Sequence, residues 1–316
     1  MSGAPRHQPV RSDPAAARKR ALAEPAWVRR LLIGITVTFL VLLLVVPLLS
    51  VFVEGLRLGW HAYLNAFADP RTRASFRLTF LVVAIAVPLN LVFGLCASWA
   101  ITRFDFRGKG LLLTLIDLPI SVSPVVSGMV YVLLFGAHGW FGSWLAAHDI
   151  KIIFAVPGIV LATVFVTFPY VARELIPVME EQGREQEEAA RLLGAGGWAI
   201  LFRVTLPRVK WALLYGVMLC TARAIGEFGA VAVVAGGRDG TMTIPLRILF
   251  LHDSMKNSVH MAAFSVASSL ALLALVTLVL KVWLERRSKE STWASSSIES
   301  ARPSAPGLPS ATSAST

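Results

Sequence analysis

The amino-acid sequence predicts an all-α, polytopic membrane protein with about six transmembrane helices. Of its 316 residues, 55% are hydrophobic and only 16% are charged, and the mean hydropathy is +0.66. So few charged residues cannot coat the surface of a soluble domain of this size. The apolar residues also occur in long blocks rather than as faces of amphipathic elements, which argues against a soluble protein with an unusually apolar core.

Six apolar blocks are each long enough for a helix that crosses the hydrocarbon core, which takes about 20 residues. They are Leu31–Val53, Leu78–Ile101, Leu111–Phe135, Ile152–Val171, Trp211–Val234 and Met261–Leu284. The first block is too long for the apolar region of a cleaved signal peptide, so it is also predicted to span the membrane. Several blocks contain prolines, which membrane helices tolerate where neighbouring groups satisfy the freed carbonyls: Pro88, Pro119, Pro124, Pro157 and Pro169.

The polar ends of the chain flank a predicted transmembrane domain at residues 31–287. Residues 1–30, rich in Pro, Ala and Arg, are predicted to be a disordered basic tail, and residues 288–316, rich in Ser, Ala and Pro, a disordered C-terminal tail. If the N-terminus is inside, the inside segments carry 21 Lys and Arg residues and the outside segments carry 8. The positive-inside rule therefore predicts that both termini are cytoplasmic.

The net charge of +11 reflects these basic residues, which lie between the apolar blocks and in the tails. They indicate topology rather than a nucleic-acid-binding face, so membrane lipid is the predicted surrounding and no nucleic-acid partner is expected. The two cysteines, Cys96 and Cys220, lie inside apolar blocks and are predicted to be free thiols. The sequence has no H-E-x-x-H pattern and no Cys/His cluster, so no metal site and no catalytic residue are predicted.

The longest inside segment, from Arg173 to Lys210, is predicted to contain two short helices. Its first part is acidic and rich in strong helix formers, and Gly194 after a Leu pair is a helix C-cap signal. A second apolar piece follows at residues 198–204 and is predicted to stop at Thr205-Leu206-Pro207. The turn between the two helices is expected at Gly194–Gly197.

Several residues of this segment have the spacing of a known motif: Glu188-Ala189-Ala190, Gly194, Val204 and Leu206-Pro207. The pattern resembles the EAA signature of bacterial ABC import permeases. The family usually has Ile where this chain has Val204. The resemblance implies an ABC type I importer permease fold, with a loop that sits in a cleft of an ATP-binding subunit and transmits its closure to the membrane helices. The alternative is an amphipathic helix on the membrane surface, although its acidic start would be repelled by anionic lipid.

Further stretches from about Leu78 to Leu280 are similar to sulfate/thiosulfate permeases of the W-type subunit. They are residues 113–119, 123–126 and 211–216, together with Ala222–Ala230, which molybdate permeases share. The resemblance implies import of sulfate or thiosulfate, with molybdate, tungstate or another oxyanion as the alternative. The chain departs from the family at residues 250–253, where the family usually has an acidic residue and a Tyr.

The same resemblance implies a set of partners in the bacterial inner membrane. These are two ATP-binding cassette subunits, a second homologous permease in a heterodimer and a periplasmic sulfate-binding protein. This chain has no G-x-x-x-x-G-K-[ST] loop, so ATP would be used by the partner subunits and no cofactor is expected on this chain. Two further alternatives are a passive channel, in which a coupling loop at about residues 173–210 would have no purpose, and an intramembrane enzyme that uses Asp117 or Glu227 as acid or base.

Two ionisable residues inside the fifth apolar block are candidates for the translocation path. Arg223 and Glu227 are four residues apart and are predicted to share one helix face near the middle of the bilayer. A guanidinium can bind a dianion such as sulfate through two hydrogen bonds. The alternative interpretation is a structural ion pair that ties helices together.

The remaining path or gate candidates are hydroxyl residues in two groups. The first group flanks the prolines of the third block: Ser121, Ser123 and Ser127. These hydroxyls either replace lost backbone partners, which is the commoner role, or line a wet path. The second group, Thr241 and Thr243, resembles the family's outer loop near the gate and would otherwise be an ordinary polar turn.

Overall fold

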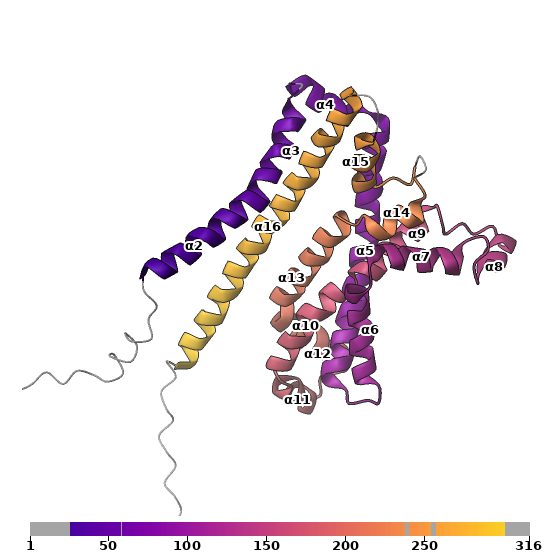
Figure 1. The fold of residues 1–316 in the computed structure, drawn as a ribbon. Helices are drawn as coiled ribbons and strands as arrows, with labels where there is room; N and C mark the ends of the chain where they lie inside the picture. The colour runs from indigo at the N-terminus through magenta and orange to yellow at the C-terminus, as the bar shows by residue number, and fades with distance from the viewer. Residues whose placement is uncertain (1–25, 58, 238–239, 254–256, 301–316) are drawn as a thin grey trace, which may run out of the picture. The chain divides into compact units, whose positions relative to one another are not determined.

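The computed structural model describes residues 26–57, 59–237, 240–253 and 257–300, and every regular element in these ranges is helical (Figure 1). The all-α prediction is therefore confirmed. The chain divides into two units, residues 1–53 and residues 54–316. The predicted N-terminal tail lies outside the described residues up to position 25.

The first unit is one apolar helical run made of α2 (Ala26–Leu40), the π-helical turn η1 (Val41–Val45) and the start of α3 (Val46–Leu56). The helix from Trp27 to Leu56 contains the first predicted span, and its most apolar stretch has no buried residue within this chain. A helix that is apolar on every side needs lipid or another protein around it.

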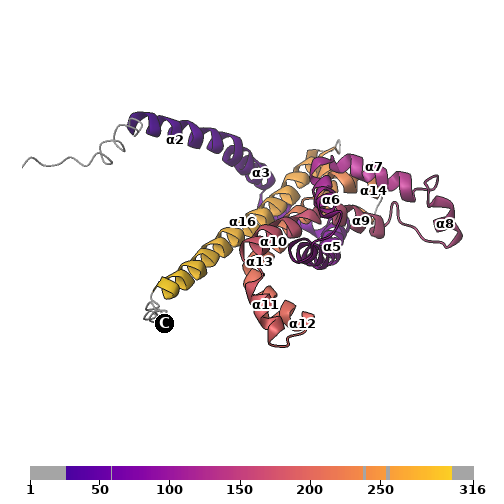
Figure 2. The same cartoon turned by 90° about the horizontal axis from the view of Figure 1, so that it is seen from below.

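From α4 onward, the described residues of the second unit form fourteen helical elements. In chain order they are α4 (Trp60–Ala68), α5 (Pro70–Arg103), α6 (Lys109–Ser121), α7 (Pro124–Phe135), α8 (Gly142–Ala147), α9 (Val156–Thr167), α10 (Pro169–Glu181), α11 (Glu185–Leu192), α12 (Gly197–Ile200), η2 (Leu201–Thr205), α13 (Leu206–Ile225), α14 (Gly229–Ala235), α15 (Ile244–His252) and α16 (Asn257–Ser300). Within this unit, α7 and α8 project away from α16 on the far side of α5 (Figures 1 and 2).

Among the described residues, four helices are long and apolar enough to cross a membrane: Trp27–Leu56, Pro70–Arg103, Val156–Glu181 and Met261–Trp283. Two bent helix pairs pass the same test, α6 with α7 and α13 with α14. If each pair is one crossing, the number of spans is six, as the sequence predicts.

The third predicted span, Leu111–Phe135, is not one straight helix. Helices α6 and α7 meet at a bend of 107° around Val122 and Ser123. Pro124 causes this break, because it donates no backbone N–H and disfavours the α conformation at Ser123, which is extended with φ −58° and ψ 132°. The fifth predicted span, Trp211–Val234, is also broken, by 49° between α13 and α14.

Several helices extend beyond the predicted spans, and α5 and α16 are two of them. Helix α5 begins at Pro70 rather than Leu78, because the Asp69 side chain accepts a hydrogen bond from the Thr72 backbone and Pro70 suits the first helical turn. Helix α16 continues to Ser300, through the first part of the predicted C-terminal tail at residues 288–316. Residues 301–316 lie outside the described part of the chain.

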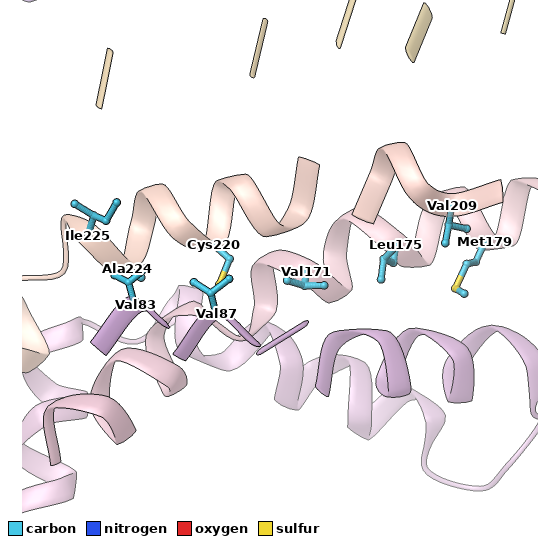
Figure 3. Packing of buried hydrophobic residues seen from close by; sticks show 9 residues of the cluster. All are labelled: Val83, Val87, Val171, Leu175, Met179, Val209, Cys220, Ala224 and Ile225. Atoms are coloured by element: carbon cyan, nitrogen blue, oxygen red, sulfur yellow. The ribbon is translucent and has the colours of Figure 1, made fainter. Parts of the chain in front are cut away.

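The core of the second unit forms where α10 packs between α5 and α13. Figure 3 shows the nine buried residues of this cluster: Val83 and Val87 from α5, Val171, Leu175 and Met179 from α10, and Val209, Cys220, Ala224 and Ile225 from α13. Two glycines allow the close approach. A Cβ at Gly94 would lie 2.7 Å from the Val171 Cβ, and one at Gly216 would lie 3.1 Å from the Val171 Cα. Small residues commonly let membrane helices pack in this way.

A buried amide adds a polar contact to this core. Asn90 of α5 is fully buried, and its Nδ2 donates to the Thr167 Oγ1 at the end of α9 over 2.7 Å. Thr167 in turn donates to the Thr163 carbonyl over 2.7 Å. Polar side chains that bond across helices stabilise membrane bundles where apolar burial supplies little driving force.

We predict that Gly94→Val separates α5 from α10 and destabilises the protein by about 1–3 kcal/mol, the usual cost of overpacking a core. The matched control is Gly110→Val, because a Cβ at Gly110 meets no atom within 4 Å. Thermal unfolding of the two purified variants in the same detergent would test this. Equal melting temperatures would contradict the close packing around Val171.

Candidate functional site

The segment that carries the EAA-like pattern forms one end of the second unit, and α4 and α15 form the other (Figure 1). Helix α11 ends at Leu192, and Gly194 follows with φ +87°, a left-handed conformation that favours glycine after a helix. The predicted first helix and its glycine turn are therefore present. The predicted stop at residues 205–207 is wrong: α12 runs through η2 into α13 without a break. Pro207 lies in the first turn of α13, where its missing N–H costs little.

The tip of this segment exposes large apolar side chains. Leu192 is 90% exposed, Leu193 89% and Trp198 75%. Glu188, Ala189 and Gly194 are exposed beside them, and Ala190, Val204 and Leu206 are half-buried, whereas Pro207 is exposed. Apolar residues that a protein exposes together mark an interaction surface.

A buried carboxylate that the sequence analysis did not single out anchors the base of the same segment. The Glu187 Oε1 accepts hydrogen bonds from the Arg103 Nη2 at 3.0 Å and from the Thr205 hydroxyl at 2.7 Å. Its Oε2 lies 2.7 Å from the Arg103 Nε, an ionic contact, and both side chains are more than nine-tenths buried. Glu187 therefore joins α11 to the end of α5 and to the start of α13.

Further hydrogen bonds fix the two sides of the segment. The Arg103 Nη1 donates to the Met179 carbonyl over 3.2 Å, and the Arg184 Nη2 donates to the Thr102 carbonyl over 2.8 Å. Gln182 and Arg208 are bonded twice, each side chain donating to the other's carbonyl over 3.2 Å. The base of the segment is therefore held by polar contacts, while the large apolar side chains at its tip are exposed.

The predicted pair Arg223 and Glu227 is in contact, but not on one continuous helix. Helix α13 ends at Ile225, so Glu227 lies in the break before α14. Its Oε2 pairs with the Arg223 Nη1, and its Oε1 accepts the Ala230 backbone N–H at 2.9 Å. Glu227 thus places a negative charge and a hydrogen-bond acceptor at the N-terminus of α14, just before the N-cap residue Phe228. The Glu227 side chain is 1% exposed and that of Arg223 is 29% exposed.

The three candidate serines lie around the α6–α7 break. The Ser121 hydroxyl lies 3.5 Å from the Asp117 carbonyl and that of Ser127 lies 3.3 Å from the Ser123 carbonyl, each bonding four residues back in its own segment. Ser123 precedes α7 and its side chain makes no capping bond. Asp117 itself is exposed, with a carboxylate oxygen 3.5 Å from the Arg173 Nε.

The two candidate threonines lie together before α15, and both are buried. The Thr241 hydroxyl donates to the Ala235 carbonyl over 2.9 Å. Thr243 is the N-cap residue of α15, and its hydroxyl has no hydrogen-bond partner among the described residues. The next backbone N–H, of Ile244, donates to the Thr79 hydroxyl on α5 over 2.9 Å.

A buried arginine that the sequence analysis also missed ties α15 to the start of α5. The Arg247 Nη2 lies 2.8 Å from the Asp69 Oδ2, and the Arg247 side chain is 6% exposed. Burial by itself raises the pKa of Asp69, but the hydrogen bonds from the Thr72 backbone and hydroxyl and the charge of Arg247 together hold that pKa below its ordinary value.

We predict that Glu227→Gln destabilises the protein by on the order of 1–3 kcal/mol, because it leaves the Arg223 charge without its partner while the amide oxygen still accepts the Ala230 N–H. The double variant Arg223→Gln with Glu227→Gln should lose less than the two single variants added together. A double-mutant cycle of unfolding free energies measures this, and strict additivity would show that the pair does not interact.

We predict that Asp69→Asn removes a stabilisation that depends on pH. A carboxyl group with a depressed pKa in the folded state stabilises that state fully above its unfolded pKa of about 3.9 and loses this effect as pH falls through the folded pKa. The difference in melting temperature between wild type and variant should therefore be constant at pH 6–8 and shrink below about pH 4. A difference that grows on acidification would contradict the pairing with Arg247.

Comparison with known proteins agrees with this architecture. The model of the family described as binding-protein-dependent transport system inner membrane component matches residues 90–290. A sulfate transport system permease protein CysW from Synechocystis is 53% identical over 82% of this chain and 94% of its own length. The Escherichia coli protein of the same name is 48% identical over 85% of this chain and 92% of its own. The Escherichia coli sulfate transport system permease protein CysT is 35% identical over 78% of this chain and 88% of its own.

Among solved structures, a chain of a bacterial alginate ABC transporter in complex with a periplasmic protein superposes with a TM-score of 0.67. It is 14% identical and covers 84% of this chain and 95% of that chain, so it shows a shared fold. The family match covers more than half of the sequence, and it includes the whole segment from α10 to α14. The chain therefore belongs to the family of binding-protein-dependent transport system inner membrane components.

Proposed function

We propose that this chain is a membrane-spanning subunit of an ATP-driven importer that moves sulfate or thiosulfate into the cytoplasm. The proposed substrate rests on the identity of 53% and 48% to two sulfate transport permeases, each over more than four-fifths of the chain. The proposed coupling to an ATP-binding subunit rests on the exposed apolar tip at Leu192, Leu193 and Trp198, whose base is held by buried polar contacts.

The proposed complex contains two ATP-binding subunits, a second permease and a periplasmic binding protein. The tip of α11 and α12 is the surface offered to an ATP-binding subunit. The 35% identity to a CysT permease supports a heterodimer of two related permeases, since Escherichia coli has sulfate transport system permease proteins of both names, CysW and CysT. The structural neighbour that was solved with a periplasmic protein supports the docking of a periplasmic binding protein.

The proposed topology places both termini and the α11 end in the cytoplasm. The support is the charge distribution of 21 Lys and Arg residues on that side against 8 on the other. Asp69, Arg247 and the threonines before α15 then lie toward the periplasm, at the end opposite α11.

Arg223 is the proposed contact for the passing anion. Its side chain is 29% exposed, whereas the carboxylate that pairs with it is almost fully buried. The guanidinium is therefore the accessible half of the pair, and Glu227 offsets part of its charge. Weak attraction suits a conduit, because an anion that bound tightly would leave slowly.

We predict that cells lacking this gene and all other sulfate uptake routes lose uptake of radiolabelled sulfate and regain it with the wild-type chain. Glu188→Lys reverses the charge offered to a basic partner, and Gly194→Asp strains a backbone with φ +87°, so each should reduce uptake at least tenfold at normal membrane levels. Glu54→Lys, a reversal at a partly exposed surface position, is the control and should restore uptake.

The same cells separate the substrate from the mechanism. Sulfate uptake that survives deletion would overturn the sulfate assignment, and labelled molybdate would then be tested in that strain. Full uptake with both Glu188→Lys and Gly194→Asp would overturn the role of α11 and α12 in coupling.

A further inference from the structure

We infer that the junction of Arg103, Glu187 and Thr205 is the joint that passes movement of α11 to the membrane helices α5 and α13. This inference rests on the proposed function, because it needs an ATP-binding subunit that moves the tip. Arg103, Glu187 and Thr205 are positioning residues in this assignment: they touch neither the anion nor ATP.

The joint connects three elements through one carboxylate. Glu187 lies in the first turn of α11, Arg103 is the last residue of α5, and Thr205 immediately precedes α13. The Oε1 of Glu187 is shared between the Arg103 Nη2 and the Thr205 hydroxyl at 3.0 and 2.7 Å. A displacement of α11 therefore changes bonds to two membrane helices at once.

The physical character of the junction suits transmission. Both charged side chains are more than nine-tenths buried, so water does not screen their attraction, and the charge-assisted bonds have a preferred direction. By contrast, the Leu192, Leu193 and Trp198 side chains at the tip contact little of this chain. A push on the tip meets its main resistance at the base, where Glu187 is held.

Helix α5 extends the effect across the unit. It has 34 residues and is therefore about 50 Å long at 1.5 Å per residue. Arg103 ends it beside α11, and Asp69 begins it beside Arg247 of α15. A shift of α5 at the joint is thus carried to the residues before α15, which include Thr241 and Thr243.

The alternative interpretation is that the ion pair of Arg103 and Glu187 only stabilises the fold. A buried ion pair contributes little net stability compared with apolar side chains of similar size, whereas removing one partner is costly. The double variant Arg103→Met with Glu187→Leu therefore separates the two roles. It leaves no unpaired charge, so it should fold and assemble, but it lacks directional bonds between α11, α5 and α13.

The test uses the complete importer in proteoliposomes, with its binding protein, and measures ATP hydrolysed per labelled sulfate moved. We expect Arg103→Met with Glu187→Leu to hydrolyse ATP within about twofold of wild type while sulfate movement falls at least tenfold, so that the ratio rises about tenfold. The charge swap Arg103→Glu with Glu187→Arg should restore part of the coupling. Glu54→Gln, which removes the partly exposed Glu54–Arg57 pair, is the matched control and should leave the ratio unchanged.

The possible outcomes separate the inferred joint from the proposed function. An unchanged ratio in the apolar double variant, or a parallel loss of hydrolysis and transport that follows complex yield, overturns the joint and leaves the proposed function standing. Absence of sulfate movement by the wild-type complex overturns the proposed function itself. A raised ratio that the charge swap lowers again supports the joint, because a purely structural pair would not change the stoichiometry.

Discussion

Every acidic or basic side chain that the described residues bury is paired with the opposite charge, and each pair lies at the end of a helix. Arg247 pairs with Asp69 at the start of α5, Arg103 with Glu187 at its end, and Arg223 with Glu227 between α13 and α14. An unpaired charge in apolar surroundings is too costly to keep, so these pairs determine where the helices can begin, end and meet. The pairs also satisfy backbone groups that helix ends leave free: the Thr72 and Ala230 N–H groups and the Met179 carbonyl.

The breaks between helices depend on these pairs and on proline. An uninterrupted helix satisfies its own backbone and needs no help from side chains, but a broken span exposes polar groups inside the membrane. Glu227 covers such a break by accepting the Ala230 N–H of α14 and holding Arg223. The α6–α7 break lies close to it, since a Cβ at Gly229 of α14 would lie 3.0 Å from the Cβ of Pro124, the first residue of α7. Both broken spans therefore meet near the residues proposed for the anion path.

How far the sequence predicts this structure follows from which interactions are local. Block length and composition locate the apolar helices, and Gly194 locates its turn, because these signals act within a few residues. The effect of proline depends on context: Pro119 stays inside α6, whereas Pro124 begins α7 after a bend of 107°. Nothing local distinguishes these two prolines, so the broken third span could not be read from the sequence.

The same limit explains the residues that the sequence analysis missed. Glu187 and Glu188 are adjacent and chemically identical, yet one is buried against Arg103 and the other is exposed. The difference arises from partners 84 residues apart in the chain, which only the fold brings together. Arg247 likewise meets Asp69 across 178 residues. A resemblance to a known motif identifies residues by position, and it says nothing about a neighbour outside the motif.

Buried ion pairs at helix ends give a moving protein what apolar packing alone does not. Apolar contacts have no direction, so helices that they hold can slide by small steps, whereas a buried pair cannot be separated gradually without a large cost. Such a pair therefore permits a few arrangements in which its charges stay together and disfavours those between. Helix α5, paired at both ends and packed closely on α10 through Gly94, is constrained to move as a unit. A transporter that must close one side before it opens the other requires this behaviour, because intermediate arrangements would leave the path open to both.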